Sequence, residues 1–172
     1  MLDVAIKYED ELKEKFINTW FKDKYKWWNS DTYYQVPEFS KDTWNKHEFV
    51  SLDSSGEIIG YISYGIVRQS NHVNHLSILN FSDNKITFGL DLHRALRDIF
   101  EKFQFRKITF NVVIGNPIEK TYDKLIKKYG GRICGYYVDD VKLADGQYYD
   151  FKAYEILSTE YFKNIKRRKN DG

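Results

Sequence analysis

The sequence predicts an α/β (α+β) domain with one mixed, mostly antiparallel sheet, which has a single parallel strand pair at its centre and is flanked by helices. Three observations support this fold class. Short segments rich in β-branched and aromatic residues are bounded by turn signals, as strands are. Two of these strands, 74–81 and 108–114, enclose a segment of helical periodicity, which indicates a right-handed parallel crossover. A hairpin near the end of the chain adds antiparallel strands.

The chain is expected to begin with a helix. Within residues 8–28, apolar side chains recur at Leu12, Phe16 and Trp20, which is the spacing of an amphipathic helix. Residues 3–6 could form a short strand before it. The sequence therefore predicts a long first helix that carries many aromatic side chains.

Strands are expected in the middle of the chain. One ends at Leu52, before a turn over residues 53–56, and the next covers residues 58–67. The strand over 74–81 leads into a helix over 88–103. The apolar stripe of that helix is formed by Phe88, Leu92, Ala95, Leu96, Ile99 and Phe103.

The second half of the chain continues this alternation. The strand over 108–114 is followed by a helix that starts near Pro117, with Asn116 as its expected cap, and ends at Gly130. The turn signal at residues 144–146 then predicts a hairpin.

Composition indicates one globular domain over residues 1–172, with a basic tail from about residue 163. Hydrophobic residues make up 42% and charged residues 30% of the chain, and no apolar run approaches the length of a membrane span. The start has no secretory-signal pattern, and the single cysteine, Cys134, fits a reducing compartment. We therefore expect a cytoplasmic protein with no membrane partner. The net charge of +2 gives little reason to expect a nucleic-acid partner.

The junction "NFSDNKITFGLDLHRAL" resembles the cofactor loop of the GNAT superfamily of acyl-CoA N-acyltransferases. Members of this family carry Gln/Arg-x-x-Gly-x-Gly/Ala between a central strand and a helix, and Asn84, Thr87 and Gly89 fall at the three defined positions. Upstream, "SSGEIIGYISYGI" looks like the family's turn and strand. Downstream, "GNPIEKTYDKLIKKYGGRICGY" is similar to its Asn, helix, Gly and strand. The resemblance extends from about Phe49 to Ile156 and implies a splayed parallel strand pair.

The resemblance implies an N-acetyltransferase. Such an enzyme moves an acetyl group from acetyl-CoA to a primary amine by direct transfer in a ternary complex, without a metal. It also implies that residues 85–90 contact the pyrophosphate and that the backbone of Leu79 pairs with the pantetheine arm. The cofactor-binding residues that it implies are Leu79, Asn80, Asn84, Lys85, Ile86, Thr87, Phe88, Gly89, Leu90 and Asn116.

Helix-start chemistry supports a phosphate site at this junction. The first N–H groups of a helix have no acceptor within the helix and lie at its positive dipole end. Gly89 would let the backbone approach a ligand, whereas Thr87 carries a Cβ but could donate its hydroxyl. The alternative interpretation is that Thr87 only caps the helix.

Two residues are candidates for proton transfer. The family often places a glutamate on the strand before the loop, but this chain has none between Val67 and Glu101. His75 lies on that strand and titrates in a suitable range, so we predict it as the base or as the residue that orients a water molecule. The family's general acid is commonly a tyrosine on the helix after the parallel strand, so the resemblance implies this role for Tyr122, six residues after Asn116. Either residue could instead be structural: His75 a surface histidine, and Tyr122 a core tyrosine.

The acceptor stays open between a small metabolite, a polyamine, an aminoglycoside and a protein N-terminus. The resemblance places the aromatic segment "WFKDKYKWWNSDTYY" over the acceptor cleft. Thr87 and the missing strand glutamate favour an alternative, a catalytically degenerate GNAT-fold binding or regulatory protein. Edge strands of the late hairpin could also pair two subunits as a homodimer.

Overall fold

The computed structural model describes residues 1–28, 37–83 and 85–170. Four α-helices, three 3-10 helices and seven strands lie within these ranges. In chain order they are β1 (Leu2–Val4), η1 (Ala5–Tyr8), α1 (Glu9–Ile17), η2 (Asp23–Tyr25), β2 (Lys46–Leu52), β3 (Ile58–Val67), η3 (Arg68–Ser70), β4 (His72–Asn80), α2 (Lys85–Glu101), β5 (Lys107–Val113), α3 (Glu119–Tyr129), β6 (Arg132–Lys142), β7 (Tyr148–Leu157) and α4 (Ser158–Asn170).

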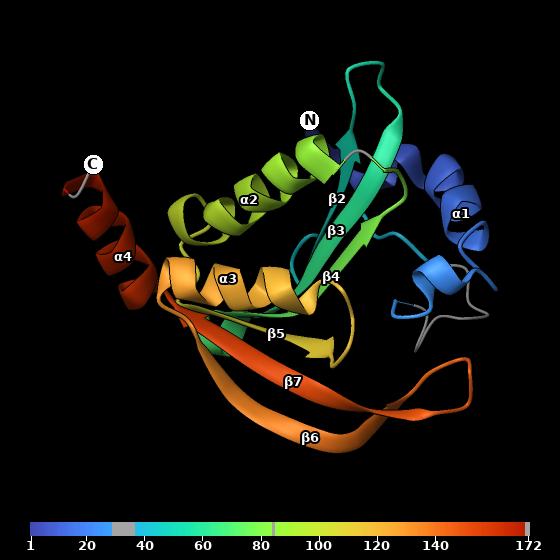
Figure 1. Cartoon of the computed structure of the whole chain (residues 1–172). Helices are drawn as coiled ribbons and strands as arrows, with labels where there is room; N and C mark the ends of the chain where they lie inside the picture. The colour runs from blue at the N-terminus through green and yellow to red at the C-terminus, as the bar shows by residue number, and fades with distance from the viewer. Residues whose placement is uncertain (29–36, 84, 171–172) are drawn as a thin grey trace.

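The seven strands form a single sheet in the order β1-β2-β3-β4-β5-β7-β6. Only β4 and β5 pair in parallel; the other neighbours are antiparallel. The parallel pair is short, because only His72 and Val73 of β4 pair with Lys107 and Ile108 of β5 before the strands diverge (Figure 1). This arrangement confirms the predicted mixed sheet and its central, splayed parallel pair.

The divergence of β4 coincides with a β-bulge. The register of β3 and β4 shifts between Ser63 and Gly65, and His75 on the opposite strand has φ of 49°, in the left-handed region. A bulge bends its strand and increases its local twist. β4 therefore turns away from β5 just after the two strands have paired.

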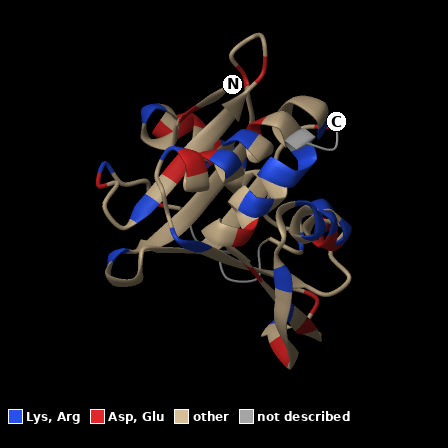
Figure 2. Cartoon of the chain, turned by 90° about the vertical axis from the view of Figure 1, so that its left-hand side faces the viewer, with Lys and Arg blue, Asp and Glu red and all other residues tan. Residues whose placement is uncertain are grey.

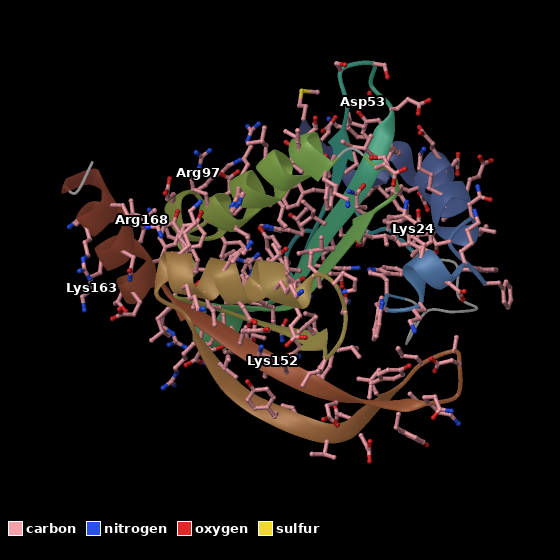
Figure 3. The ribbon with its side chains drawn as sticks, in the orientation of Figure 1. Lys24, Asp53, Arg97, Lys152, Lys163 and Arg168 are labelled. Atoms are coloured by element: carbon pink, nitrogen blue, oxygen red, sulfur yellow. The ribbon has the colours of Figure 1, made fainter. Side chains whose placement is uncertain are left out.

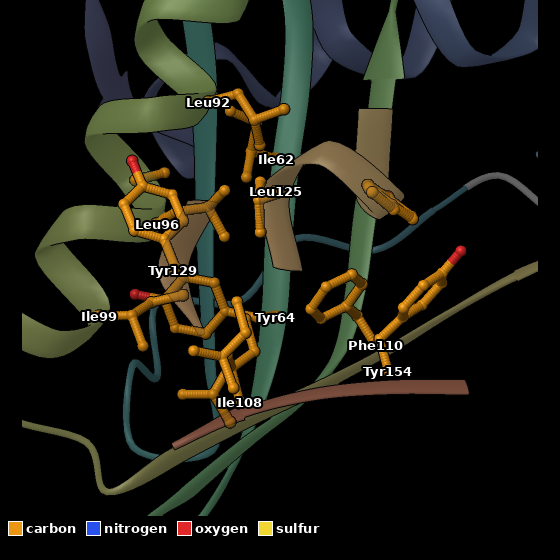
Figure 4. Packing of buried hydrophobic residues seen from close by; sticks show 14 of the residues in the cluster. Ile62, Tyr64, Leu92, Leu96, Ile99, Ile108, Phe110, Leu125, Tyr129 and Tyr154 are labelled. Carbon is orange, nitrogen blue, oxygen red and sulfur yellow. The ribbon is translucent and has the colours of Figure 1, made fainter. Parts of the chain in front are cut away.

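Apolar side chains pack on both faces of the sheet. On one face, Ile62 and Tyr64 of β3 pack with Leu96 of α2, Leu125 of α3 and further apolar side chains (Figure 4). On the other face, the core around Leu12, Phe16, Val50, Ile58, Tyr61 and Leu79 is covered by α1. This packing holds the sheet and the helices in one body, so the ends of β4 and β5 are fixed relative to α2 and α3.

The first helix is shorter than predicted. It ends at Ile17, and the prediction of a helix to residue 28 is wrong. Both the backbone N–H and the hydroxyl of Thr19 donate to the carbonyl of Phe16, and Phe21 adopts a left-handed φ of 57°. These features end the helix, so the aromatic residues after it are not part of α1.

The end of the chain also differs from its prediction. Residues predicted as a charged tail belong to α4. Tyr161 anchors this helix, because its ring stacks on Phe100 at 4.5 Å and its hydroxyl donates to Glu101 at 2.7 Å.

Charged residues of both signs are spread over the chain (Figure 2), in keeping with its small net charge. Within the described ranges, no helix is both long and apolar enough to cross a membrane.

The hairpin of β6 and β7 forms one edge of the sheet. β6 is the last strand, and nearly all of its residues are exposed. An open edge strand offers unpaired backbone groups to another chain. The homodimer predicted at this edge stays a prediction.

Candidate active site

The diverging ends of β4 and β5 open a cleft of ≈ 690 Å³. One wall comes from residues 76–80 of β4 and the other from residues 111–113 of β5. Further lining comes from the start of α2, from α3 and the turn before it, from β7 and from the segment after α1. Those further residues are Asp23, Lys24, Tyr25, Trp27, Trp28, Phe88, Asn116, Pro117, Ile118, Tyr122 and Phe151.

The backbone of β4 is exposed to this cleft. Phe81 donates its N–H to Ile59, and antiparallel pairs alternate, so Leu79 also uses its backbone groups to bond β3. The pairing of Leu79 with a pantetheine arm stays a prediction, although this register already engages its backbone groups with β3. The backbone groups of Ile78 and Asn80 point to the cleft instead, where β5 has already diverged.

The start of α2 lies at one end of the cleft. The helix begins at Lys85, three residues before the predicted start at Phe88. The ring of Phe88 is buried against β3, and a Cβ added to Gly60 would lie 2.2 Å from it. Only glycine at position 60 allows this close packing. It sets the first turn of α2 directly after the open end of β4.

The loop between β4 and α2 is held on both sides. The Asn80 side chain accepts a hydrogen bond from the Ser82 N–H at 2.9 Å, which closes a turn after the strand. From the segment after α1, the Tyr25 hydroxyl donates to the Phe81 carbonyl at 3.3 Å and Lys24 pairs with Asp83 at 3.1 Å. These contacts place the aromatic segment beside the loop.

Tyr122 on α3 reaches the cleft from the other side. Its ring is 4% exposed and packs edge-on against Phe110 at 5.0 Å. Its hydroxyl has no hydrogen-bond partner among the residues that the structure describes, and buried hydroxyls usually have one. Burial raises the pKa of Tyr122, with the nearby Tyr154 adding to the shift. The group is therefore a protonated donor at neutral pH, and its position suits a partner inside the cleft.

An ion network fixes the helix that carries Tyr122. Lys152 of β7 (Figure 3) is 5% exposed. Its ammonium lies 3.0 Å from Glu119 and 2.8 Å from Asp123. The Tyr154 hydroxyl donates to the same Asp123 oxygen at 2.9 Å. Burial alone would lower the pKa of Lys152, but its bonds to the two carboxylates outweigh this and raise it. The start of α3 is thereby tied to β7.

Known proteins resemble this chain in structure rather than in sequence. No family model matches the sequence, and no curated protein matches it. Spermidine N-acetyltransferase from Vibrio cholerae, solved in complex with CoA and spermine, superposes with a TM-score of 0.72 at 19% identity, covering 94% of this chain and 97% of that one. A probable acetyltransferase gives a TM-score of 0.67 at 15% identity, covering 93% of both chains. The chain has the GNAT fold.

The cofactor-binding residues predicted from the GNAT resemblance divide into two groups. Leu79, Asn80, Phe88 and Asn116 line the cleft. Lys85, Ile86, Thr87, Gly89 and Leu90 lie in the first two turns of α2, outside the lining, and Asn84 falls outside the described residues. Lys85, Ile86 and Leu90 are exposed. Gly89 has no atom within 4 Å of an added Cβ, so this turn is open to a ligand.

Asn116 has a different structural role from the predicted one. The α3 helix begins at Glu119, not near Pro117, and its N-cap is Ile118 rather than Asn116. The Asn116 side chain accepts from the Ile118 N–H at 3.1 Å, and its carbonyl accepts from the Glu119 N–H at 2.9 Å. Asn116 therefore shapes the turn that leads into α3 while it lines the cleft.

His75 is not brought together with Tyr122. It lies in the bulge of β4, is exposed, and is absent from the residues that line the cleft. The structure gives no support for the predicted role of base or water-orienter. Sequence periodicity assigned His75 to the correct strand but could not show the bulge that changes its orientation.

Three polar or aromatic lining residues were missed by sequence reasoning. Asn111 is a polar residue inside the apolar strand "ITFNVV", which is a signal that the sequence does contain. Asp23 lies in the segment that the resemblance placed over the acceptor cleft, but no role was predicted for its carboxylate. Phe151 reaches the cleft from β7, and no local pattern distinguishes it from the other aromatic residues of that strand.

Proposed function

We propose that this protein is an N-acetyltransferase that moves an acetyl group from acetyl-CoA to a primary amine in a ternary complex. The observation that carries the proposal is the cleft between β4 and β5, which has the start of α2 at one end and the buried Tyr122 among its lining residues. The likeness to acetyltransferases of known structure supports this assignment.

The residues present fit acetyl-CoA. The start of α2 is a positive dipole end, and the open surface at Gly89 leaves room for a pyrophosphate. The cleft-facing backbone groups of Ile78 and Asn80 can pair with the amides of a pantetheine arm as an extra strand would. Acetyl-CoA supplies an activated acyl group as a thioester.

The transfer requires that a C–N bond form at the acyl carbon while the C–S bond breaks. Tyr122 is suited to give its proton to the departing sulfur, because burial keeps its hydroxyl protonated. The attacking amine must also lose a proton. Asp23 is the only carboxylate, and no histidine occurs, among the described lining residues. We propose that this proton leaves through Asp23 or through water beside it.

Release of free thiol from acetyl-CoA in the presence of a panel of primary amines, including spermidine, tests the proposal. Replacement of Tyr122 by Phe should lower kcat by about 100-fold or more, because general acid catalysis typically contributes that much. Tyr137→Phe, on the exposed edge strand β6, is the matched control and should leave kcat unchanged. Binding of acetyl-CoA without thiol release for any amine would instead indicate a GNAT-fold binding protein that lacks catalysis.

A further inference from the structure

The wall of the cleft contributed by the segment after α1 is aromatic. Tyr25, Trp27 and Trp28 line it, and Phe151 of β7 also belongs to the lining. The ring of Trp27 lies 3.4 Å from the position of a Cβ on Gly115, so this ring closes over the turn that follows β5. Such walls offer large, rigid apolar surfaces, and aromatic faces also attract a single cation.

The same wall carries almost no net charge. Among the described lining residues, only Asp23 and Lys24 are charged, and they have opposite signs. Between the lining residues Tyr25 and Trp27 lies Lys26, whose ammonium is 4.6 Å from the centre of the Trp27 ring. Within residues 23–28, two lysines therefore accompany one carboxylate.

Carboxylates close to the cleft already have cationic partners. Glu119 and Asp123 both bind Lys152. Asp145, in the hairpin turn, lies 3.9 Å from Lys26. An incoming ligand with several ammonium groups would have to compete with these lysines for each carboxylate.

We infer that the acceptor is a primary amine with one ammonium group and an aromatic or apolar body, that is, an arylalkylamine rather than a polyamine. This inference rests on the proposed function and names its substrate class. Asp23 is exposed and is the one carboxylate among the described lining residues, so it offers a partner to one ammonium group. The aromatic body of the substrate would pack between Trp27, Trp28 and Phe151.

Steady-state thiol release at saturating acetyl-CoA tests this choice directly. We expect kcat/KM for 2-phenylethylamine and tryptamine to exceed the values for spermidine and spermine by about tenfold or more. Trp27→Ala should lower kcat/KM for the arylalkylamines by about tenfold, because it removes a packing surface of the substrate. Trp44→Ala is the control, because Trp44 is exposed and lies outside the described lining. Its loss should leave kcat/KM unchanged for both the arylalkylamines and the polyamines.

The outcomes separate this inference from the proposed function. If spermidine or spermine is acetylated faster than the arylalkylamines, the acceptor class is wrong while the acetyltransferase assignment stands. If acetyl-CoA binds but neither class releases thiol, the inference is also wrong. If calorimetry shows no binding of acetyl-CoA, the proposed function itself fails.

Discussion

Lys152 of β7 and Asp123 of α3 form an ion pair, with 2.8 Å between Nζ and Oδ1, directly beside the residue proposed as general acid. Lys152 also binds Glu119. The two carboxylates that flank Tyr122 in the sequence, Glu119 and Asp123, are therefore paired with the same lysine. The pKa of Asp123 is lowered, because the hydrogen bonds from Lys152 and Tyr154 outweigh burial, which alone would raise it. The ammonium therefore holds the first turns of α3 against the sheet.

Loss of this lysine should impair turnover more than cofactor binding. Lys152→Met should lower kcat by about tenfold, because a displaced catalytic group loses rate steeply, and leave the KM for acetyl-CoA nearly unchanged. In the Tyr122→Phe background the same change should cost no further kcat. Lys142→Met on exposed β6 is the matched control. Equal losses in both backgrounds would show that Lys152 does not act through Tyr122.

Gly60 should be indispensable for the position of α2. A Cβ at this residue would lie 2.2 Å from the Phe88 ring. Overpacking of this kind typically costs about 1–3 kcal/mol, so Gly60→Ala should lower the free energy of unfolding by that amount in urea titrations. It should also weaken acetyl-CoA binding, because the first turn of the helix must shift. An unchanged urea midpoint for Gly60→Ala would contradict the close packing of Phe88 on Gly60.

Gly89 provides the opposite case. Nothing lies within 4 Å of an added Cβ, and alanine favours a helix interior by about 1 kcal/mol over glycine. Gly89→Ala should therefore raise the free energy of unfolding. If the pyrophosphate approaches this turn, the same change should weaken acetyl-CoA binding in calorimetry. A variant that is more stable and binds as tightly as the wild type would exclude close contact at Gly89.

The ion cluster of Glu155 should make stability depend on pH. This buried carboxylate binds Lys107 and Arg132. The hydrogen bond from Lys107, helped by Arg132, lowers the pKa of Glu155 against the opposing effect of burial. Since the folded pKa lies below the unfolded one, the stabilisation is present above the unfolded pKa and is lost as pH falls through the folded pKa.

Glu155→Gln should accordingly lower the free energy of unfolding by about 1–3 kcal/mol at pH 7. The difference from the wild type should shrink below about pH 4, near the ordinary pKa of glutamate. Urea unfolding from pH 7 to pH 3 measures this difference. Glu57→Gln, in an exposed turn, should show no such dependence. A difference in free energy of unfolding that stays constant with pH would contradict the lowered pKa of Glu155.

Much of the fold could be predicted because its signals are local. β-Branched and aromatic residues after a turn signal located β3 at Ile58–Val67, and the strand–helix–strand order implied the parallel pair. The end of α1 could not be predicted, since it depends on hydrogen bonds from Thr19 to Phe16. The bulge at His75 could not be predicted either, because a bulge shifts the alternation of side chains along a strand without changing its composition.

The candidate site was predicted only in part, because only some of its residues are marked by local sequence signals. The start of α2 and Tyr122 follow from motif order along the chain. Asp23 and Phe151 reach the cleft only through tertiary packing, and the backbone groups that face it depend on the register of β4 against β3.

Calorimetric titration of the full chain with acetyl-CoA tests the central claim most directly, namely that the opening between β4 and β5 is a thioester site. We predict saturable heat with one site per chain, weakened by Gly89→Ala and retained by Tyr137→Phe. The absence of any heat with millimolar acetyl-CoA would contradict the account.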